Sequence, residues 1–141
     1  MKNQATILIA DRNPHIRDFL SREMALKGYR VCLAKSGREV LKWVSNHESI
    51  DLVILDLDLP DASEVAILEK LEDRMPTLPV VVHAFLSDHA NHPAFLNAAA
   101  IVEKKGNSIE RLNKVVYEIL RKSKPEQFSV TKDNNQQKAK P

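Results

Sequence analysis

Short apolar runs alternate with longer segments of helical periodicity along most of this chain. Each run has four to six residues and little period-2 alternation, a pattern typical of strands covered on both faces of a parallel sheet. The predicted strands are Thr6–Ala10, Tyr29–Ala34, Leu52–Leu55, Pro79–Ala84 and Ala99–Glu103. Strands that alternate with helices in this way predict an α/β fold built from βαβ units.

The first predicted helix has clear signals at both ends. Asn13 is a suitable N-cap and Pro14 suits the first helical position. Gly28 can end the helix in the left-handed conformation. The apolar stripe that we expect to face the core contains Ile16, Phe19, Leu20 and Met24, with Leu26 as a further candidate.

Four more helices follow from the same periodicity. Ser36 can cap the second helix, whose apolar positions are Val40, Leu41 and Val44. The third begins near Asp61 and carries Val65, Leu68 and Leu71. The fourth, Ser87–Asn97, is interrupted by Pro93. The fifth has the strongest stripe: Leu112, Val115, Val116, Ile119 and Leu120. We therefore expect one domain over residues 1–123 and a polar, disordered tail over residues 124–141.

Composition narrows the class of protein. The chain is 43% hydrophobic and 28% charged, with a net charge of +2, so no basic patch favours direct binding of nucleic acid. Cys32 lies in an apolar run and is expected to be a buried structural thiol. The chain has neither a signal peptide nor an apolar stretch approaching about 18 residues. These features predict a cytoplasmic protein that does not bind membranes.

The segment Asp51–Pro60 carries the candidate chemistry. Its apolar run places Asp56 at the carboxyl end of a buried strand, and ligands of open α/β sheets bind at such ends. Asp58 follows two residues later, and Pro60 stops the strand. The alternative interpretation is that both are solvated acids in a loop.

Four motifs, in order and spacing, resemble the response-regulator receiver domain of bacterial phosphorelays. They are Ile7–Pro14 with Asp11, Leu55–Pro60 with Asp56, Val82–Ala84, and Val102–Lys104. The resemblance covers roughly residues 5–122. It implies a flavodoxin-like (βα)5 fold with a doubly wound parallel sheet in strand order 2-1-3-4-5.

The resemblance also implies a role for each motif. Asp56 would accept phosphate from a sensor histidine kinase or a phosphotransfer protein. Mg²⁺ would bind Asp11, Asp56 and the backbone carbonyl of Asp58, since this hard ion prefers oxygen ligands. Lys104 would pair with the phosphoryl oxygens, or Lys105 would if the strand register differs by one. A downstream output protein would bind the face formed by the fourth strand, fourth helix and fifth strand, through which a homodimer could also form.

Several positions depart from the family pattern. Arg12 replaces the second acid of the metal-binding pair, which weakens the expected Mg²⁺ site. Its guanidinium either reaches Asp56 and partly replaces the metal or points into solvent. His83 stands where the family has a small hydroxyl, and Ile101 stands where an aromatic side chain often switches. Ser63-Glu64 replaces the usual Asp-Gly after the phosphorylation loop.

Three further functions compete with phosphorylation. A pseudo-receiver would use the fold as a protein-interaction module without phosphate, and Arg12 and His83 favour it. A flavodoxin-like enzyme is disfavoured, because the chain has no Gly-rich phosphate loop, Walker motif or Gly-x-Ser-x-Gly. We therefore expect a signalling domain and not an enzyme. A zinc site at His83, Asp88, His89 and His92 matches no common ligand spacing.

Overall fold

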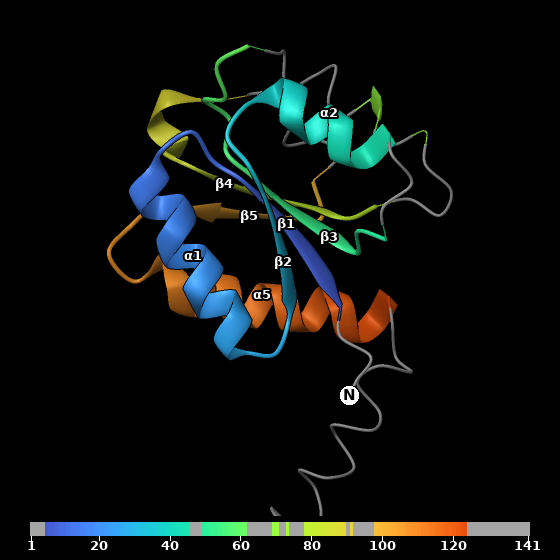
Figure 1. Ribbon diagram of the computed structural model, residues 1–141. Coiled ribbons are helices and arrows are strands. Elements are labelled where there is room, and N and C mark those ends of the chain that lie inside the picture. Colours follow the sequence, from blue (N-terminus) through green and yellow to red (C-terminus); the bar gives the residue numbers. More distant parts are fainter. Residues whose placement is uncertain are drawn as a thin grey trace, which may run out of the picture.

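A five-stranded parallel sheet organises the chain in the computed structural model (Figure 1). The structure describes residues 5–45, 49–61, 69–70, 73, 78–89, 91 and 98–123. The strands are β1 (Thr6–Ala10), β2 (Arg30–Ala34), β3 (Leu52–Leu55), β4 (Val80–Ala84) and β5 (Ala100–Glu103). They pair in the order β2-β1-β3-β4-β5, and every pair is parallel. The predicted fold class and strand order are confirmed.

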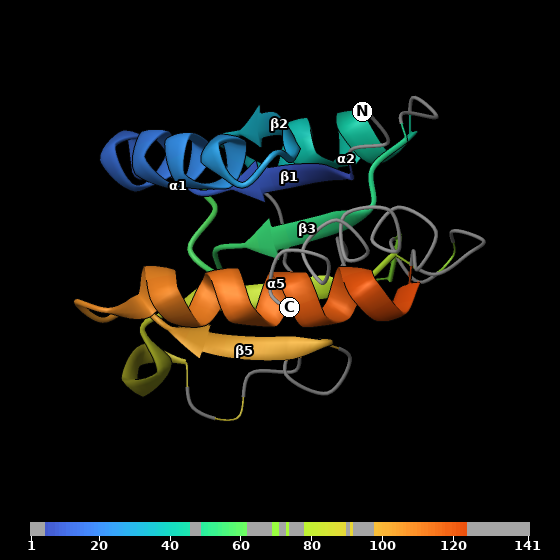
Figure 2. The ribbon, with the colours of Figure 1, turned by 90° about the horizontal axis from the view of Figure 1, so that it is seen from below.

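Helices cover both faces of this sheet. The described helices are α1 (Pro14–Leu26), α2 (Gly37–Ser45) and α5 (Ser108–Ser123), with a short 3₁₀ turn, η1 (Leu86–Asp88). Figure 1 shows α2 on one side of the sheet and α1 with α5 on the other, and Figure 2 shows α1 and α5 from their own side. None of these helices has the length and apolar character needed to cross a bilayer.

Burial of the strands explains why apolar and polar residues alternate so little along them. All four residues of β3 and all five of β4 are buried. Successive side chains point to opposite faces, so Val53 packs in the core on the α2 side and Ile54 in the core on the α1–α5 side. Because both faces are covered, both sets of positions must be apolar.

The predicted caps of α1 are confirmed. The side chain of Asn13 accepts hydrogen bonds from the backbone N–H of His15 (2.9 Å) and Ile16 (3.3 Å), and Pro14 opens the helix. At the other end Gly28 has φ +95°, a left-handed conformation that costs glycine little. Both ends of α1 are therefore determined by residues next to them in the sequence.

The predicted apolar stripe of α1 is wrong at two positions. Leu20 and Met24 are fully buried, as expected, but Leu26 is 79% exposed and Phe19 is 40% exposed. At about 100° per residue, Leu26 lies on nearly the opposite side of the helix from Met24. Its apolar character does not place it in the core.

The remaining elements agree with the prediction where they are described. The Ser36 hydroxyl accepts the backbone N–H of Glu39 (3.2 Å), and Asp61 adds an unexpected second cap at the backbone N–H of Gly37 (2.9 Å). Leu112, Val116 and Leu120 of α5 are buried. The prediction that Cys32 is a buried thiol is wrong: the residue is only half-buried, because β2 is an edge strand.

Several predictions fall outside the described residues. These are most of the third helix with Val65, Leu68 and Leu71, most of the Ser87–Asn97 helix, the Ser63-Glu64 departure, His92, and the tail at 124–141. Of the predicted fourth helix, the described residues show the η1 turn, which begins at Leu86.

Candidate functional site

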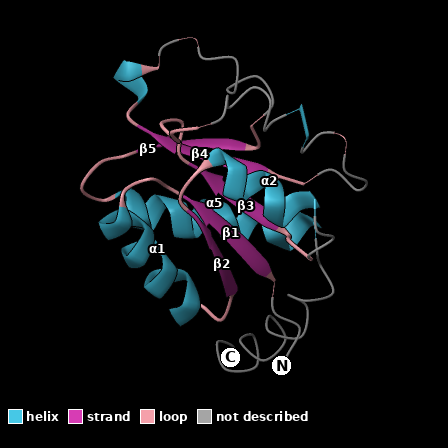
Figure 3. Cartoon of the chain, turned by 45° about the horizontal axis from the view of Figure 1, so that its top comes forward, coloured by secondary structure: helices cyan, strands magenta, loops and turns pink. Residues whose placement is uncertain are grey.

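Three strand ends bring two acids and a lysine together. Asp11 follows β1, Asp56 follows β3 and Lys104 follows β5. Because these strands are parallel members of one sheet (Figure 3), all three residues leave it at its carboxyl edge. The Nζ atom of Lys104 lies 3.1 Å from Oδ2 of Asp11 and 3.3 Å from Oδ1 of Asp56. Asp11 is 2% exposed and Asp56 is 1% exposed. The sequence-based grouping of these residues is therefore present as one buried cluster.

Backbone hydrogen bonds hold the three residues in register just beyond the strands. The N–H of Asp11 donates to the carbonyl of Ala34 (3.1 Å), and that of Asp56 donates to Ala10 (2.9 Å). The N–H of Lys104 donates to Ala84 (2.9 Å). Each bond extends the parallel ladder by one step, so the rigid sheet and not a loose loop positions the charged side chains.

Asp56 receives three hydrogen-bond or ion-pair donors. Its Oδ2 accepts the backbone N–H of Arg12 (3.2 Å), and its Oδ1 accepts the backbone N–H of Asp58 (3.1 Å) as well as pairing with Lys104. These contacts hold the carboxylate in one orientation. A carboxylate that is held in place in this way is positioned to act as a nucleophile.

The surroundings of Asp11 disfavour its charged form. Burial raises the pKa of Asp11, the backbone N–H of Asn13 (2.9 Å) opposes that rise, the nearby Asp56 raises the pKa further, and Lys104 lowers it. Two carboxylates thus share one ammonium group, which leaves an excess of negative charge in a buried site. Such a site attracts an additional cation.

The donor set can be compared with the needs of Mg²⁺. The carboxylates of Asp11 and Asp56 are hard oxygen ligands, and Mg²⁺ usually keeps several waters beside one or two protein carboxylates. Within the described ranges, no three side chains of His, Cys, Asp or Glu gather closely enough to hold a metal. The residues therefore fit a hydrated Mg²⁺ with few protein ligands.

Arg12 and Asp58 contact Asp56 through their backbone N–H groups, while their side chains lie outside the cluster. The Arg12 residue is exposed, and its guanidinium forms no ion pair with any residue in the described part of the chain. Of the two arrangements considered for Arg12, the structure contains the solvent-facing one. The Asp58 carboxylate lies 3.0 Å from Nε2 of His89, a contact that sequence reasoning missed.

The choice between the two lysines is settled by geometry. The Lys104 side chain is 8% exposed and contacts both buried acids, whereas that of Lys105 is 65% exposed and lies 3.5 Å from Glu103. The ring of Phe85 lies 5.5 Å from Nζ of Lys104, close enough for a cation–π contact. No sequence signal had drawn attention to Phe85.

His83 occupies the end of β4 next to this cluster. The residue is 3% exposed, and its Nε2 lies 3.2 Å from the hydroxyl of Ser108, the first residue of α5. Burial, and after it the charge of Lys104, lower the pKa of His83 from 6.5 to about 4. The imidazole is therefore neutral at physiological pH. Ile101, the other atypical position, is half-buried in β5 and packs against the core on the α2 side.

The pH dependence of stability should report the buried state of His83. Because its pKa is lower in the folded state than in the unfolded state, His83 contributes stability above about pH 6.5 that is lost as the pH falls towards about 4. We expect urea unfolding of wild type and His83→Gln to show a difference that shrinks by up to about 3 kcal/mol across this range. His15→Gln, a matched change at an exposed position on α1, should leave the profile unchanged. A constant difference between wild type and His83→Gln would contradict the buried, neutral imidazole.

Comparison with known proteins agrees with this geometry. The family model of the response regulator receiver domain matches residues 7–117. The chain is 36% identical over 77 residues to the DNA-binding transcriptional regulator NtrC of Bradyrhizobium sp. (strain RP501 Parasponia), covering 55% of this chain and 16% of that protein. It is 34% identical over 94 residues to the transcriptional regulatory protein KdpE of Mycobacterium tuberculosis, covering 67% and 41%. The chain thus spans less than half the length of these relatives.

Solved structures give the same result. The response regulator TrrA of Thermotoga maritima, crystallised in complex with Mg²⁺-BeF, has a TM-score of 0.71 and 27% identity, covering 81% of this chain and 98% of that one. A CheY-like receiver domain of Methanospirillum hungatei has a TM-score of 0.74 and 25% identity, covering 87% and 98%. The family match, the 2-1-3-4-5 sheet and the clustered acids lead to one conclusion. The chain belongs to the response regulator receiver domain family.

Proposed function

We propose that Asp56 is the phosphoacceptor of this receiver domain. The observation that carries the proposal is the buried Lys104 ammonium, which lies between the carboxylates of Asp56 and Asp11. A carboxylate oxygen of Asp56 would attack the phosphorus of a phosphohistidine, the P–N bond would break, and an acyl phosphate would form. Lys104 would stay close enough to pair with the new phosphoryl oxygens. Phosphoryl transfer depends mostly on such positioning and charge neutralisation.

The test locates the acyl phosphate chemically. After incubation with acetyl phosphate and Mg²⁺, the intact protein should gain one phosphoryl group. Reduction with borohydride converts an aspartyl phosphate to homoserine, and peptide sequencing by mass spectrometry should find this product at position 56. Homoserine at position 11 or 58, or no adduct over a wide range of phosphodonor concentration, would contradict the assignment.

Mg²⁺ is part of the proposal. The TrrA relative was crystallised with Mg²⁺-BeF, and Asp11 and Asp56 of this chain offer two buried carboxylates, with the backbone carbonyl of Asp58 as an expected third ligand. When bound, the ion neutralises negative charge on the transferring phosphoryl group. We expect weak binding, because Arg12 supplies no oxygen ligand.

An Arg12→Asp variant should bind Mg²⁺ more tightly. The change removes a cation and adds an oxygen ligand at the edge of the site, and we expect at least a tenfold gain in affinity, or about 1.4 kcal/mol. Calorimetric titration of Mg²⁺ measures it. Arg12→Ala separates loss of the cation from gain of a ligand. Arg22→Asp, which makes the same charge change on an exposed residue of α1, should bind as wild type does. Equal affinities in Arg12→Asp and Arg12→Ala would show that position 12 is not a ligand position.

A phosphorylation-independent module is the second candidate function. It is favoured by His83, which stands where the family has a small hydroxyl. The imidazole of His83 is instead bonded to Ser108. In that case the unmodified fold would bind its partner, and the phosphorylation test would be negative.

The partners belong to the proposal as well. We expect a histidine kinase or phosphotransfer protein to donate phosphate in the cytoplasm, and an output protein or a second copy of the chain to bind the face of β4 and β5. Several relatives are transcriptional regulators by name, but the matched region spans only part of them.

A further inference from the structure

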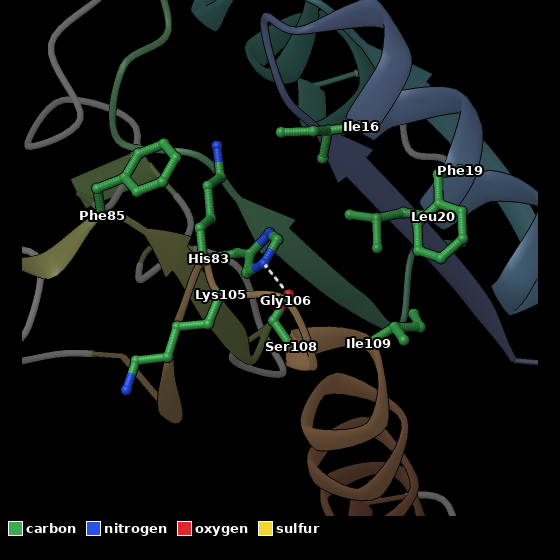
Figure 4. A pocket seen from close by; sticks show the side chains of 10 residues that line it. Ile16, Phe19, Leu20, His83, Phe85, Lys105, Gly106, Ser108 and Ile109 are labelled. Carbon is green, nitrogen blue, oxygen red and sulfur yellow. Dashed lines mark hydrogen bonds between the residues drawn. The ribbon is translucent and has the colours of Figure 1, made fainter.

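A cavity of about 420 Å³ lies beside the acid cluster, between α1 and the loop that joins β5 to α5 (Figure 4). Its apolar lining consists of Ile16, Phe19, Leu20, Phe85 and Ile109. The two aromatic side chains, Phe19 and Phe85, are 40% and 47% exposed and lie on opposite sides of His83 in Figure 4. A cavity of this volume with a mainly apolar lining is typical of sites for small organic ligands.

The charged residues that line the cavity are both basic. Lys104, Lys105, His83 and Ser108 line the cavity, and no acidic residue does. The acids that neutralise Lys104 lie outside the lining. Ser108 also opens the 16-residue helix α5, whose N-terminus favours negative charge. Because Asp11 and Asp56 already share the charge of Lys104, Lys105 and the N-terminus of α5 are the features that suit an anion at this end of the cavity.

His83, which lines the cavity, carries an unsatisfied polar atom. The residue is 3% exposed, yet its Nδ1 atom has no hydrogen-bond partner in the part of the chain that the structure describes. A buried polar atom without a partner is costly and usually has a functional explanation. Nε2 is already bonded to the Ser108 hydroxyl (3.2 Å). That hydroxyl can make a further hydrogen bond, so a ligand acceptor atom would extend the chain from His83 through Ser108.

We propose that this cavity binds a small organic acid with a flat apolar body. Its ring would pack against Phe19 and the neighbouring apolar lining of α1. Its carboxylate would lie at the Ser108 hydroxyl and the N-terminus of α5, with Lys105 at the rim. The ligand would contact His83 and Lys104, the two residues that also border Asp56, and so would adjoin the phosphorylation site. The proposal does not depend on phosphorylation of Asp56.

The test uses the unphosphorylated full chain without any phosphodonor. Addition of 3-phenylpropanoate to ¹⁵N-labelled protein should shift the amide signals of Gly106, Ser108 and Ile109, with a Kd of about 1 mM, as expected for a ligand of this size. The matched neutral compound, 3-phenylpropanamide, should bind at least about tenfold more weakly, as should acetate, which lacks the ring. Because no phosphate is present, the result is separate from the test of Asp56.

Two variants check the location. Ser108→Ala and Phe19→Ala should each weaken binding by at least about fivefold. Ser123→Ala makes the same change as Ser108→Ala at the opposite end of α5 and should bind as wild type does. The amide spectrum of each variant shows whether it is folded. The proposal is overturned if the probe causes no shift at about 10 mM, if the acid and the amide bind equally, or if Ser108→Ala binds normally. Binding confined to another surface would overturn it too.

Discussion

An Asp56→Asn variant should lose the phosphoryl adduct completely when it is incubated with acetyl phosphate and Mg²⁺. The amide that replaces the carboxylate has nearly the same shape, but it is not a nucleophile and cannot form an acyl phosphate. Asp56 is 1% exposed and held by two backbone N–H groups and Lys104, so no neighbouring residue shares its position. Intact-mass spectrometry of wild type and variant in parallel measures the effect.

Asp58→Asn is the matched control. This acid is only two residues away, but its carboxylate lies 3.0 Å from His89, and only its backbone N–H contacts Asp56. The substitution keeps that N–H, so we expect Asp58→Asn to gain the adduct to nearly the wild-type extent. An adduct that persists in Asp56→Asn, or disappears equally in both variants, would be inconsistent with Asp56 as the acceptor.

Replacing Lys104 with Met should cause the second large effect, a loss of stability at neutral pH. Met keeps most of the side-chain length but removes the ammonium that lies 3.1 Å from Asp11 and 3.3 Å from Asp56. Removing one partner from a buried ion pair typically costs about 3–5 kcal/mol, because uncompensated charge remains. We expect a decrease of this size in the free energy of unfolding, measured by urea denaturation.

The loss should depend on pH and on Mg²⁺. Burial already raises the pKa of Asp11 in the presence of Lys104, and a raised carboxyl pKa means that stability is present at low pH and is lost as the pH rises through that pKa. The deficit of Lys104→Met should therefore shrink in acid. Mg²⁺ should also restore stability, more in the variant than in wild type, because a cation can replace the ammonium.

Lys105→Met provides the comparison for this experiment. Lys105 is the adjacent residue, its side chain is 65% exposed, and its contact with Glu103 is at the surface. A surface pair of this kind contributes less than about 1 kcal/mol. A similar cost in both variants would contradict a special role for Lys104. A Lys104→Met deficit that Mg²⁺ leaves unchanged would show that the two acids do not hold the metal.

The strands could be predicted because their pattern is dictated by burial on both faces. Leu52–Leu55 was predicted without error, and β2, β4 and β5 each began one residue after the predicted start. The ends of α1 were equally clear, since Asn13, Pro14 and Gly28 act through local backbone geometry. The errors concern exposure. Leu26 lies off the buried stripe, and Cys32 is half-buried on an edge strand, which composition does not reveal.

The candidate site was predictable to the extent that strand ends determine it. Parallel strands end at one edge of the sheet, so residues 11, 56 and 104 had to come close together once the strands were identified. The bond of His83 to Ser108, the pairing of Asp58 with His89, and the position of Phe85 over Lys104 were missed. These contacts join side chains from different segments of the chain, and no periodicity encodes them.

Among the described residues, the sequence by itself determined the strands, the helices α1, α2 and α5, and the placement of the two acids and the lysine at one edge of the sheet. These features follow from local hydrophobic periodicity, caps and turns. Only the tertiary structure decided which neighbouring lysine enters the cluster and where Arg12 points. A shift of one residue at the end of β5 exchanges Lys104 for Lys105. That register depends on the hydrogen bonds between β4 and β5, which include the N–H of Lys104 donating to Ala84 (2.9 Å). The direction of a side chain at the end of a strand is therefore set by packing between distant segments. This direction decides whether a lysine is a buried cation in the cluster or a solvated one at the surface.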